Sequence, residues 1–212
     1  MSNPVRKRGR PPALERDVGL DIAARLFWER GYEGTSTADL TKAMGINPPT
    51  LYSMFGSKQE LYRQALEFGI ARESGRRMKI LASPLPAYDA LRLYLCDIAD
   101  GDTQPDKPRG CMVSTAVLQH AEENASVAQM TAALREASMQ TLKTRFDRAV
   151  EERELPVQTD TDTLARFYGA IIQGMSAQAC DGACNARLKR LIDLALTAWP
   201  GKRGTQRKAE QR

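Results

Sequence analysis

The sequence predicts an all-α protein of about nine helices. Apolar residues recur three and four positions apart through most of the 212 residues, which is the spacing of one helix face. Glycines and prolines separate these stretches, and no stretch alternates apolar and polar residues as a half-buried strand does. A hydrophobic content of 42% is enough for a packed core, and no run approaches the roughly 18 apolar residues of a membrane span.

Charge is concentrated at the two ends of the chain. Residues 1–12 carry four basic residues and no acidic one, and residues 201–212 carry five basic residues and one acidic one. The residues between them are mildly acidic, with 22 basic and 25 acidic side chains. Basic ends favour a polyanion such as nucleic acid, although a basic C-terminal tail (residues 201–212) is also explained by solubility alone.

Compartment follows from the cysteines and the N-terminus. Four cysteines are too few for a disulfide scaffold, so reduced thiols are expected. The basic N-terminus has no apolar run behind it, which argues against a secretory signal. The sequence therefore predicts a cytoplasmic protein.

The first elements are an arm and a helix. Residues 1–13 lack apolar periodicity and contain Pro11-Pro12, which predicts an extended basic arm. A helix is expected from Leu14 to about Gly31, because glycine is a common C-terminal cap. Its apolar stripe is expected to consist of Val18, Ile22 and Leu26.

Cap residues delimit three further helices. The hydroxyls of residues 35–37 can cap a short second helix that Gly45 stops. Asn47 can cap a third helix, with Pro48 at the first position, where no backbone donor is needed. Ser57 can cap a long fourth helix. The side chains expected to face inward are Leu40, Ala43, Ile46, Leu51 and Phe55.

Five more helices are expected after a proline-rich break at residues 83–86. Their approximate ranges are 88–98, 111–120, 126–154, 164–175 and 188–199. A polar loop with two prolines is expected at 101–110. Small residues in the helix near 164–175 suit close helix packing across a two-fold axis; they are Ala165, Gly169 and Gly174.

Residues 36–55 predict a helix-turn-helix, which lays its second helix in the DNA major groove. The residues expected to face outward on that helix are Pro48, Pro49, Thr50, Tyr52 and Ser53. Thr50 can offer its methyl group to thymine and its hydroxyl to either base type. Tyr52 and Lys58 have the reach for phosphates, and Thr35 and Thr37 stand where free backbone N–H groups can clamp one. An ordinary helical hairpin is the alternative.

Three segments resemble the N-terminal domain of TetR-family transcriptional regulators. They are Leu26-Phe27-Trp28-Glu29-Arg30-Gly31-Tyr32-Glu33-Gly34-Thr35-Ser36, Leu40-Thr41-Lys42-Ala43-Met44-Gly45-Ile46 and Leu51-Tyr52-Ser53-Met54-Phe55-Gly56-Ser57-Lys58-Gln59-Glu60-Leu61. The resemblance implies a DNA-binding domain at residues 14–66 and a homodimer that binds a palindromic operator. It also implies a ligand-binding and dimerisation domain at 67–200. The positions that the family uses on DNA fall at Thr37, Pro49, Thr50, Tyr52 and Lys58.

This chain departs from the common family form at two positions of the third helix. Leu51 replaces a second aromatic residue before Tyr52, and Met54 stands where histidine is frequent. The base preference is therefore not implied by the resemblance.

The arm predicts a second DNA contact. Arg8-Gly9-Arg10-Pro11 resembles the core of an AT-hook, in which an extended Arg-Gly-Arg lies in a narrow A·T minor groove. Arg8 and Arg10 are therefore expected to bind DNA beside the helix-turn-helix, as homeodomain arms do.

An effector pocket is expected between the central helices, by the same resemblance. The candidate lining residues are Met112, Thr115, Gln119, Phe167, Tyr168, Ile171 and Met175. Methionines adapt to varied apolar ligands. The same residues are equally suited to a plain hydrophobic core.

The sequence predicts no catalytic, cofactor or metal site. His120 has no partner at triad spacing, and the glycine-rich nucleotide motifs are missing. Cys180 and Cys184 would share a face only on an unbroken helix, and two thiolates do not close a metal site. Cys111 follows Arg109, a setting that lowers a thiol pKa and suits a redox-sensing thiol, whereas a small buried core cysteine is the alternative.

Together these observations predict a homodimeric repressor, not an enzyme, whose partners are double-stranded operator DNA and a small-molecule inducer. Three alternatives remain. The first is a thiol- or metal-responsive regulator of the same fold. The second is a nucleoid protein indifferent to sequence, and the third is an all-α enzyme with a hydrophobic substrate.

Overall fold

The computed structural model describes residues 14–118 and 120–201, and all regular secondary structure within these ranges is helical. The α-helices there are α1 (Arg16–Arg30), α2 (Thr37–Met44), α3 (Pro48–Phe55), α4 (Lys58–Ala82), α5 (Ala87–Asp102), α6 (Ala125–Glu151), α7 (Thr161–Cys180) and α8 (Asn185–Ala195). Two 3-10 helices are η1 (Glu122–Asn124) and η2 (Leu196–Ala198). The all-helical prediction is confirmed.

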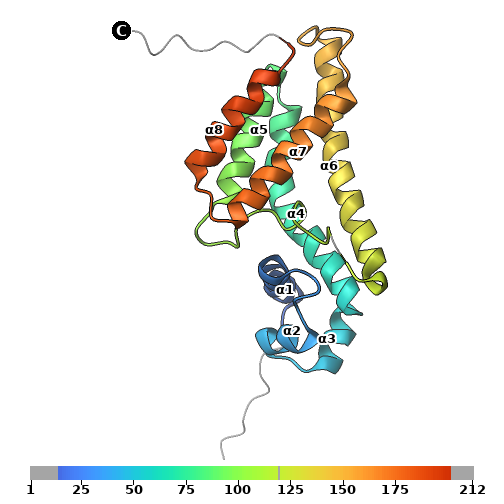
Figure 1. Cartoon of the computed structure of the whole chain (residues 1–212). Helices are drawn as coiled ribbons and strands as arrows, with labels where there is room; N and C mark the ends of the chain where they lie inside the picture. Colours follow the sequence, from blue (N-terminus) through green and yellow to red (C-terminus); the bar gives the residue numbers. More distant parts are fainter. Residues whose placement is uncertain (1–13, 119, 202–212) are drawn as a thin grey trace, which may run out of the picture.

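The molecule is elongated, with α1, α2 and α3 gathered at one end (Figure 1). We call residues 14–66 the head, and the remaining helices the bundle. Helix α4 runs from the head into the bundle without a break, and α6 begins near the head and runs alongside the bundle away from it. The described helices include none with the length and apolar character that a membrane span requires.

The N-terminal caps of the head helices form as predicted. Ser36 and Asp39 make a reciprocal capping box on α2. The Asn47 side chain accepts a hydrogen bond from the Thr50 amide at 2.9 Å and caps α3. The Ser57 hydroxyl accepts one from the Glu60 amide at 3.1 Å and caps α4. Between α2 and α3, Gly45 turns the chain in the left-handed conformation (φ 67°) that favours glycine.

The buried face of α1 differs from the predicted stripe. Val18 is 49% exposed, and the buried residues are Gly19, Leu20, Ala23 and Phe27. A Cβ atom on Gly19 would lie 2.7 Å from the ring of Phe55. Helix α1 therefore meets the Phe55 ring through a glycine. The buried face of α1 lies about one residue along from the face that apolar spacing indicates.

The segment 111–120 is not the predicted α-helix; its described residues form turns. Gly110 and Val117 have positive φ angles of 76° and 43°, which an α-helix excludes. The Arg135 guanidinium of α6 donates to the carbonyls of Val113 (3.2 Å) and Ala116 (2.9 Å). Carbonyls that a helix would use internally are therefore bound by a side chain from another element.

Aromatic rings hold the head together. Phe27 of α1 meets Tyr62 of α4 edge-on at 4.9 Å between centroids, and Tyr32 lies 5.0 Å from Tyr62. Leu40, Leu51 and Phe55, predicted to face inward, are buried in the same cluster. Ala43, also predicted inward, is exposed.

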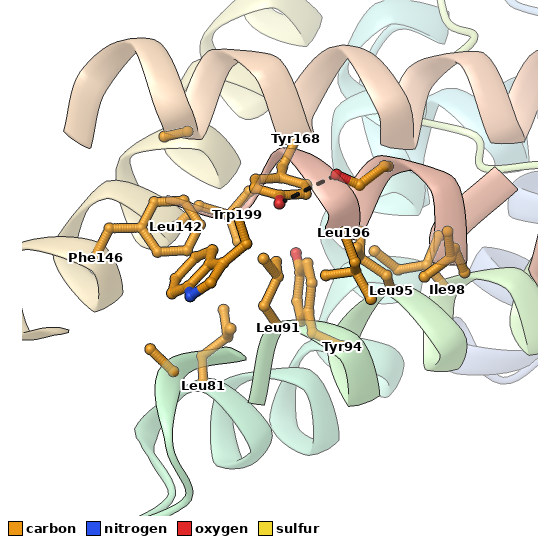
Figure 2. Close-up of a cluster of buried hydrophobic side chains, with 14 of the residues drawn as sticks. Leu81, Leu91, Tyr94, Leu95, Ile98, Leu142, Phe146, Tyr168, Leu196 and Trp199 are labelled. Carbon is orange, nitrogen blue, oxygen red and sulfur yellow. Dashed lines mark hydrogen bonds between the residues drawn. The ribbon is translucent and has the colours of Figure 1, made fainter. Parts of the chain in front are cut away.

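A second core fills the bundle (Figure 2). The Trp199 ring packs edge-on to Phe146 at 5.6 Å, and Phe146 lies 6.0 Å from Tyr168. The buried Tyr168 hydroxyl donates to the carbonyl of Ala195 at 3.4 Å, which ties α7 to α8. Gly169, expected to face a partner subunit, instead faces α6, where its Cβ position lies 3.0 Å from Met139; Ala165 is also buried within this core.

The N-terminal end of α6 contacts the head through polar groups that we call the head clamp. The Glu33 carboxylate accepts hydrogen bonds from the Ala121 amide (3.1 Å) and the Asn124 side chain (2.8 Å). Gln59 of α4 donates to the Ser126 hydroxyl at 3.0 Å. Both hydrogen bonds to Glu33 lower the pKa of its carboxyl group, with the Ala121 amide as the largest cause. These contacts join residues far apart in sequence and connect the head to the N-terminal end of α6.

Candidate nucleic-acid interface

The helix-turn-helix places α3 at the surface with one buried side and one open side. Leu51 and Phe55 are buried on the inner side. The exposed residues of α3 are Pro48, Pro49, Tyr52 and Ser53, and Tyr52 is 49% exposed. Four of the five outward residues predicted for α3 are therefore exposed together, and the helix has a free face that a groove can receive.

Thr50, the fifth predicted residue, is half-buried at the edge of this face. Its hydroxyl donates to the Asn47 side-chain oxygen at 2.7 Å, and its amide donates to the same oxygen. The Thr50 hydroxyl proton is therefore used within the N-terminal cap of α3.

Thr35 lies away from the surface that its predicted role requires. Its side chain is fully buried, and its hydroxyl donates to the Gly31 carbonyl at 2.8 Å. Thr35 therefore secures the end of α1, and Ser36, one residue later, supplies the cap of α2. The sequence Thr35-Ser36-Thr37 does not indicate which of the three hydroxyl residues is buried and which one caps α2.

The N-terminus of α2 already holds a negative group. The Asp39 carboxylate accepts a hydrogen bond from the Ser36 amide at 2.9 Å and lies 3.4 Å from Arg30. The Ser36 hydroxyl is the largest cause of the lowered pKa of Asp39. A phosphate at this end of α2 would meet an ionised carboxylate, so the predicted clamp is reduced to Thr37, which is half-buried.

Lys58 is held against an aromatic ring rather than extended into solvent. Its ammonium lies 4.3 Å from the centroid of the Tyr32 ring, and partial burial lowers its pKa. Lys42, in the last turn of α2, is exposed beside the turn and was not among the predicted residues.

Arg16 contacts the C-terminal end of α3. No local sequence pattern predicts this contact. The Arg16 guanidinium donates to the Met54 carbonyl at the end of α3 and lies 5.1 Å from the centroid of the Phe55 ring. The hydrogen bond joins residues 38 positions apart, so only the fold brings them together. The other two predicted DNA contacts, Arg8 and Arg10, lie outside the described residues.

The predicted effector residues divide between the two cores. Tyr168 and Met175 are fully buried in the bundle core, with Ile171 packed against it. Met112 instead packs against the head core, and the Thr115 hydroxyl donates to the Cys111 carbonyl at 2.9 Å. Phe167 is partly exposed, and Gln119 lies outside the described residues. The structure does not bring these residues together around one cavity.

Two open hollows lie elsewhere on the described surface. One, of about 440 Å³, lies at the start of α7, and its lining residues include Phe167, Leu164 and Pro156. The other, of about 370 Å³, lies between Val117–Leu118 and the N-terminal half of α6. The second adjoins the segment that leads to the head clamp.

The cysteines occupy separate settings. Cys111 is half-buried and directly follows Gly110, which packs against Cys180. The Cys180 thiol contacts the Arg109 carbonyl at 3.3 Å, and burial raises its pKa. Cys180 ends α7 and Cys184 precedes α8, so they do not share a helix face. Within the described ranges, no three side chains of metal-ligating type come together.

Comparisons with known proteins agree on one family. The family model "Bacterial regulatory proteins, tetR family" matches residues 20–65. The HTH-type transcriptional repressor ComR of Escherichia coli K12 is 33% identical over 92% of this chain and 93% of its own. The repressor BdcR of the same strain is 28% identical over 82% of this chain and 83% of its own.

A solved structure shows the same fold. It is a cysteine-substituted form of the TetR family transcriptional regulator CifR, complexed with 26 bp double-strand operator DNA. It superposes with a TM-score of 0.87 at 37% identity and covers 91% of this chain and 100% of that chain.

Proposed function

The chain belongs to the tetR family of bacterial regulatory proteins, and we propose that it is a repressor that binds double-stranded operator DNA as a homodimer. The domain division that we propose is a DNA-binding domain at residues 14–66 and a ligand-binding and dimerisation domain at 67–200. A small-molecule inducer releases the protein from its operator.

The observation that carries the proposal is the exposed face of α3 on a rigid helix-turn-helix. Tyr52 and Ser53 are exposed, whereas Leu51 and Phe55 anchor the helix in the head core. An exposed recognition helix of this kind fits the major groove. The likeness to CifR, whose structure contains operator DNA, supports the same role for this chain.

Selection of bound duplexes from a random DNA pool tests the proposal. A homodimer should enrich a palindrome whose half-sites are centred about 34–36 Å apart, one helical turn. Equal binding of random and selected DNA at matched salt would instead indicate a nucleoid protein indifferent to sequence.

For the dimer interface we propose the outer face of α7 and α8. Phe167, Ala170 and Ala177 are exposed along one side of α7, and Leu194 of α8 is 70% exposed. An apolar face of this kind pairs with its own copy about a two-fold axis. Of the three small residues expected at a two-fold interface, Ala165 and Gly169 face inward. Gly174 has no atom within 4 Å of its Cβ position and lies between Ala170 and Ala177 along α7.

Deletion of residues 1–12 should weaken operator binding and reduce its salt dependence. Each lost phosphate contact lowers the slope of log affinity against log salt by about 0.9. Titrations at several salt concentrations measure this slope. Deletion of residues 202–212 is a matched control, because both segments carry the same net charge; it should leave the slope unchanged. If the slope is unchanged after deletion of residues 1–12, the arm does not contact DNA and serves only solubility.

For the inducer to release the protein from DNA, it must bind more tightly to an arrangement of the two heads that does not fit the operator than to the one that does. The head clamp is the proposed element that sets the arrangement, because Glu33 joins the head to the tip of α6. A ligand in the hollow beside Val117–Leu118 would lie next to this contact.

Glu33→Ala should loosen the clamp, seen as several-fold faster hydrogen exchange of the Ala121 amide, which loses its acceptor. Glu33→Gln keeps an acceptor oxygen and should retain part of the protection. The pKa of Glu33 is lowered in the folded protein, so the clamp stabilises at pH above the usual carboxyl pKa and is lost as pH falls through the folded value. Unchanged exchange at Ala121 in Glu33→Ala would show that Glu33 does not hold the head.

A further inference from the structure

The exposed face of α3 lacks the charged and amide side chains that make the most specific hydrogen bonds to bases. The helix has the sequence PPTLYSMF and contains no charged and no amide side chain. Arginine and lysine read guanine, asparagine and glutamine read adenine, and acidic residues read cytosine. None of these pairings is available from within α3.

The nearest candidates from adjoining positions are already engaged or lie off the helix. Asn47 precedes α3, but its side-chain oxygen accepts two hydrogen bonds from Thr50, and a bidentate contact with adenine needs that oxygen. The ammonium of Lys58 lies over the Tyr32 ring. Lys42 belongs to α2.

Besides the hydroxyl groups of Tyr52 and Ser53, the exposed face of α3 presents apolar carbon atoms. Pro48 and Pro49 are exposed at its first two positions and have no N–H groups, so this helix end offers ring carbons where most helices offer amide donors. The hydrogen bond from the Thr50 hydroxyl to Asn47 fixes the side-chain rotamer and so the direction of the Thr50 methyl group. The only base feature in the major groove that matches such carbons is the C5-methyl group of thymine.

We propose that α3 reads its half-site mainly by van der Waals contact of Pro48, Pro49 and the Thr50 methyl group with thymine methyl groups. Tyr52 and Ser53 add single hydrogen bonds. The inference rests on the proposed function, because it names what α3 recognises in the operator.

The test uses a duplex selected from a random pool, with individual thymines replaced by deoxyuridine. This change removes one methyl group from the major groove and leaves Watson–Crick pairing and the minor groove intact. Loss of one buried methyl group should weaken binding about threefold to fivefold in each half-site. The effect should be confined to the thymines under α3.

A double-mutant cycle separates contact from DNA shape. In Pro48→Ala and Pro49→Ala, the affinity ratio between thymine and deoxyuridine duplexes should fall toward one, because the contacting carbons are gone. In Ser53→Ala, a matched change on the same face, the ratio should stay that of the unaltered protein. Circular dichroism and thermal melting show that each variant is folded.

Two outcomes overturn the inference while leaving operator binding in place. One is a selected sequence whose binding does not change with deoxyuridine at any position. The other is a deoxyuridine effect of equal size in the proline variants, which assigns it to DNA shape. Failure to select any sequence would instead remove the proposed function.

Discussion

Leu194→Glu should convert the protein to a monomer and lower operator affinity by about 10²–10⁴-fold. Two linked heads bind two half-sites with an effective concentration that single heads lack, and that factor is lost when the subunits separate. The glutamate would bury a charge in the proposed interface of α7 and α8. Leu194 is 70% exposed in the single chain, so the subunit itself should keep its stability.

Sedimentation velocity and operator titration measure the two effects together. Ala170→Glu, on the α7 side of the same face, should reproduce both. Met78→Glu is the control, because Met78 is a 51% exposed apolar residue on α4, outside the proposed interface. A dimeric Leu194→Glu protein would place the interface elsewhere, and a monomer of unchanged affinity would show that one head suffices.

Local rules predicted the head well, because a single cap or turn residue determines where each of its helices begins or ends. Ser36, Asn47, Gly45 and Ser57 act within three residues of where they stand, so caps and turns are visible in the sequence. The same rules failed for 111–120. There Arg135, about twenty positions away, binds the carbonyls that a helix would use, and tertiary contacts override apolar periodicity.

The candidate interface shows the same division. Exposure of Pro48, Pro49, Tyr52 and Ser53 follows from the helical period once Leu51 and Phe55 are taken as the inner face. The burial of Thr35 does not follow from any local pattern, since neighbouring hydroxyl residues are equally good caps. The support that Arg16 gives to the end of α3 depends on a contact between distant segments.

Phe55→Ala should destabilise the head by about 3–5 kcal/mol, the usual cost of removing a buried phenylalanine. The ring is 2% exposed and fills the space beside Gly19 of α1. The Arg16 guanidinium also lies over this ring, 5.1 Å from its centroid. Loss of the ring leaves a cavity between α1 and α3 and removes the anchor that orients α3, so operator binding should be lost with it.

Denaturant unfolding and operator titration of the same preparations test this expectation. Phe55→Leu preserves much of the volume and should cost less than alanine. Ser53→Ala, two residues earlier on the open face, should change the free energy of unfolding by less than about 0.5 kcal/mol. The comparison separates the two sides of α3, since Phe55 acts through packing and Ser53 through the groove. An unfolding midpoint for Phe55→Ala equal to that of the unaltered protein would mean that α3 is not held by this ring.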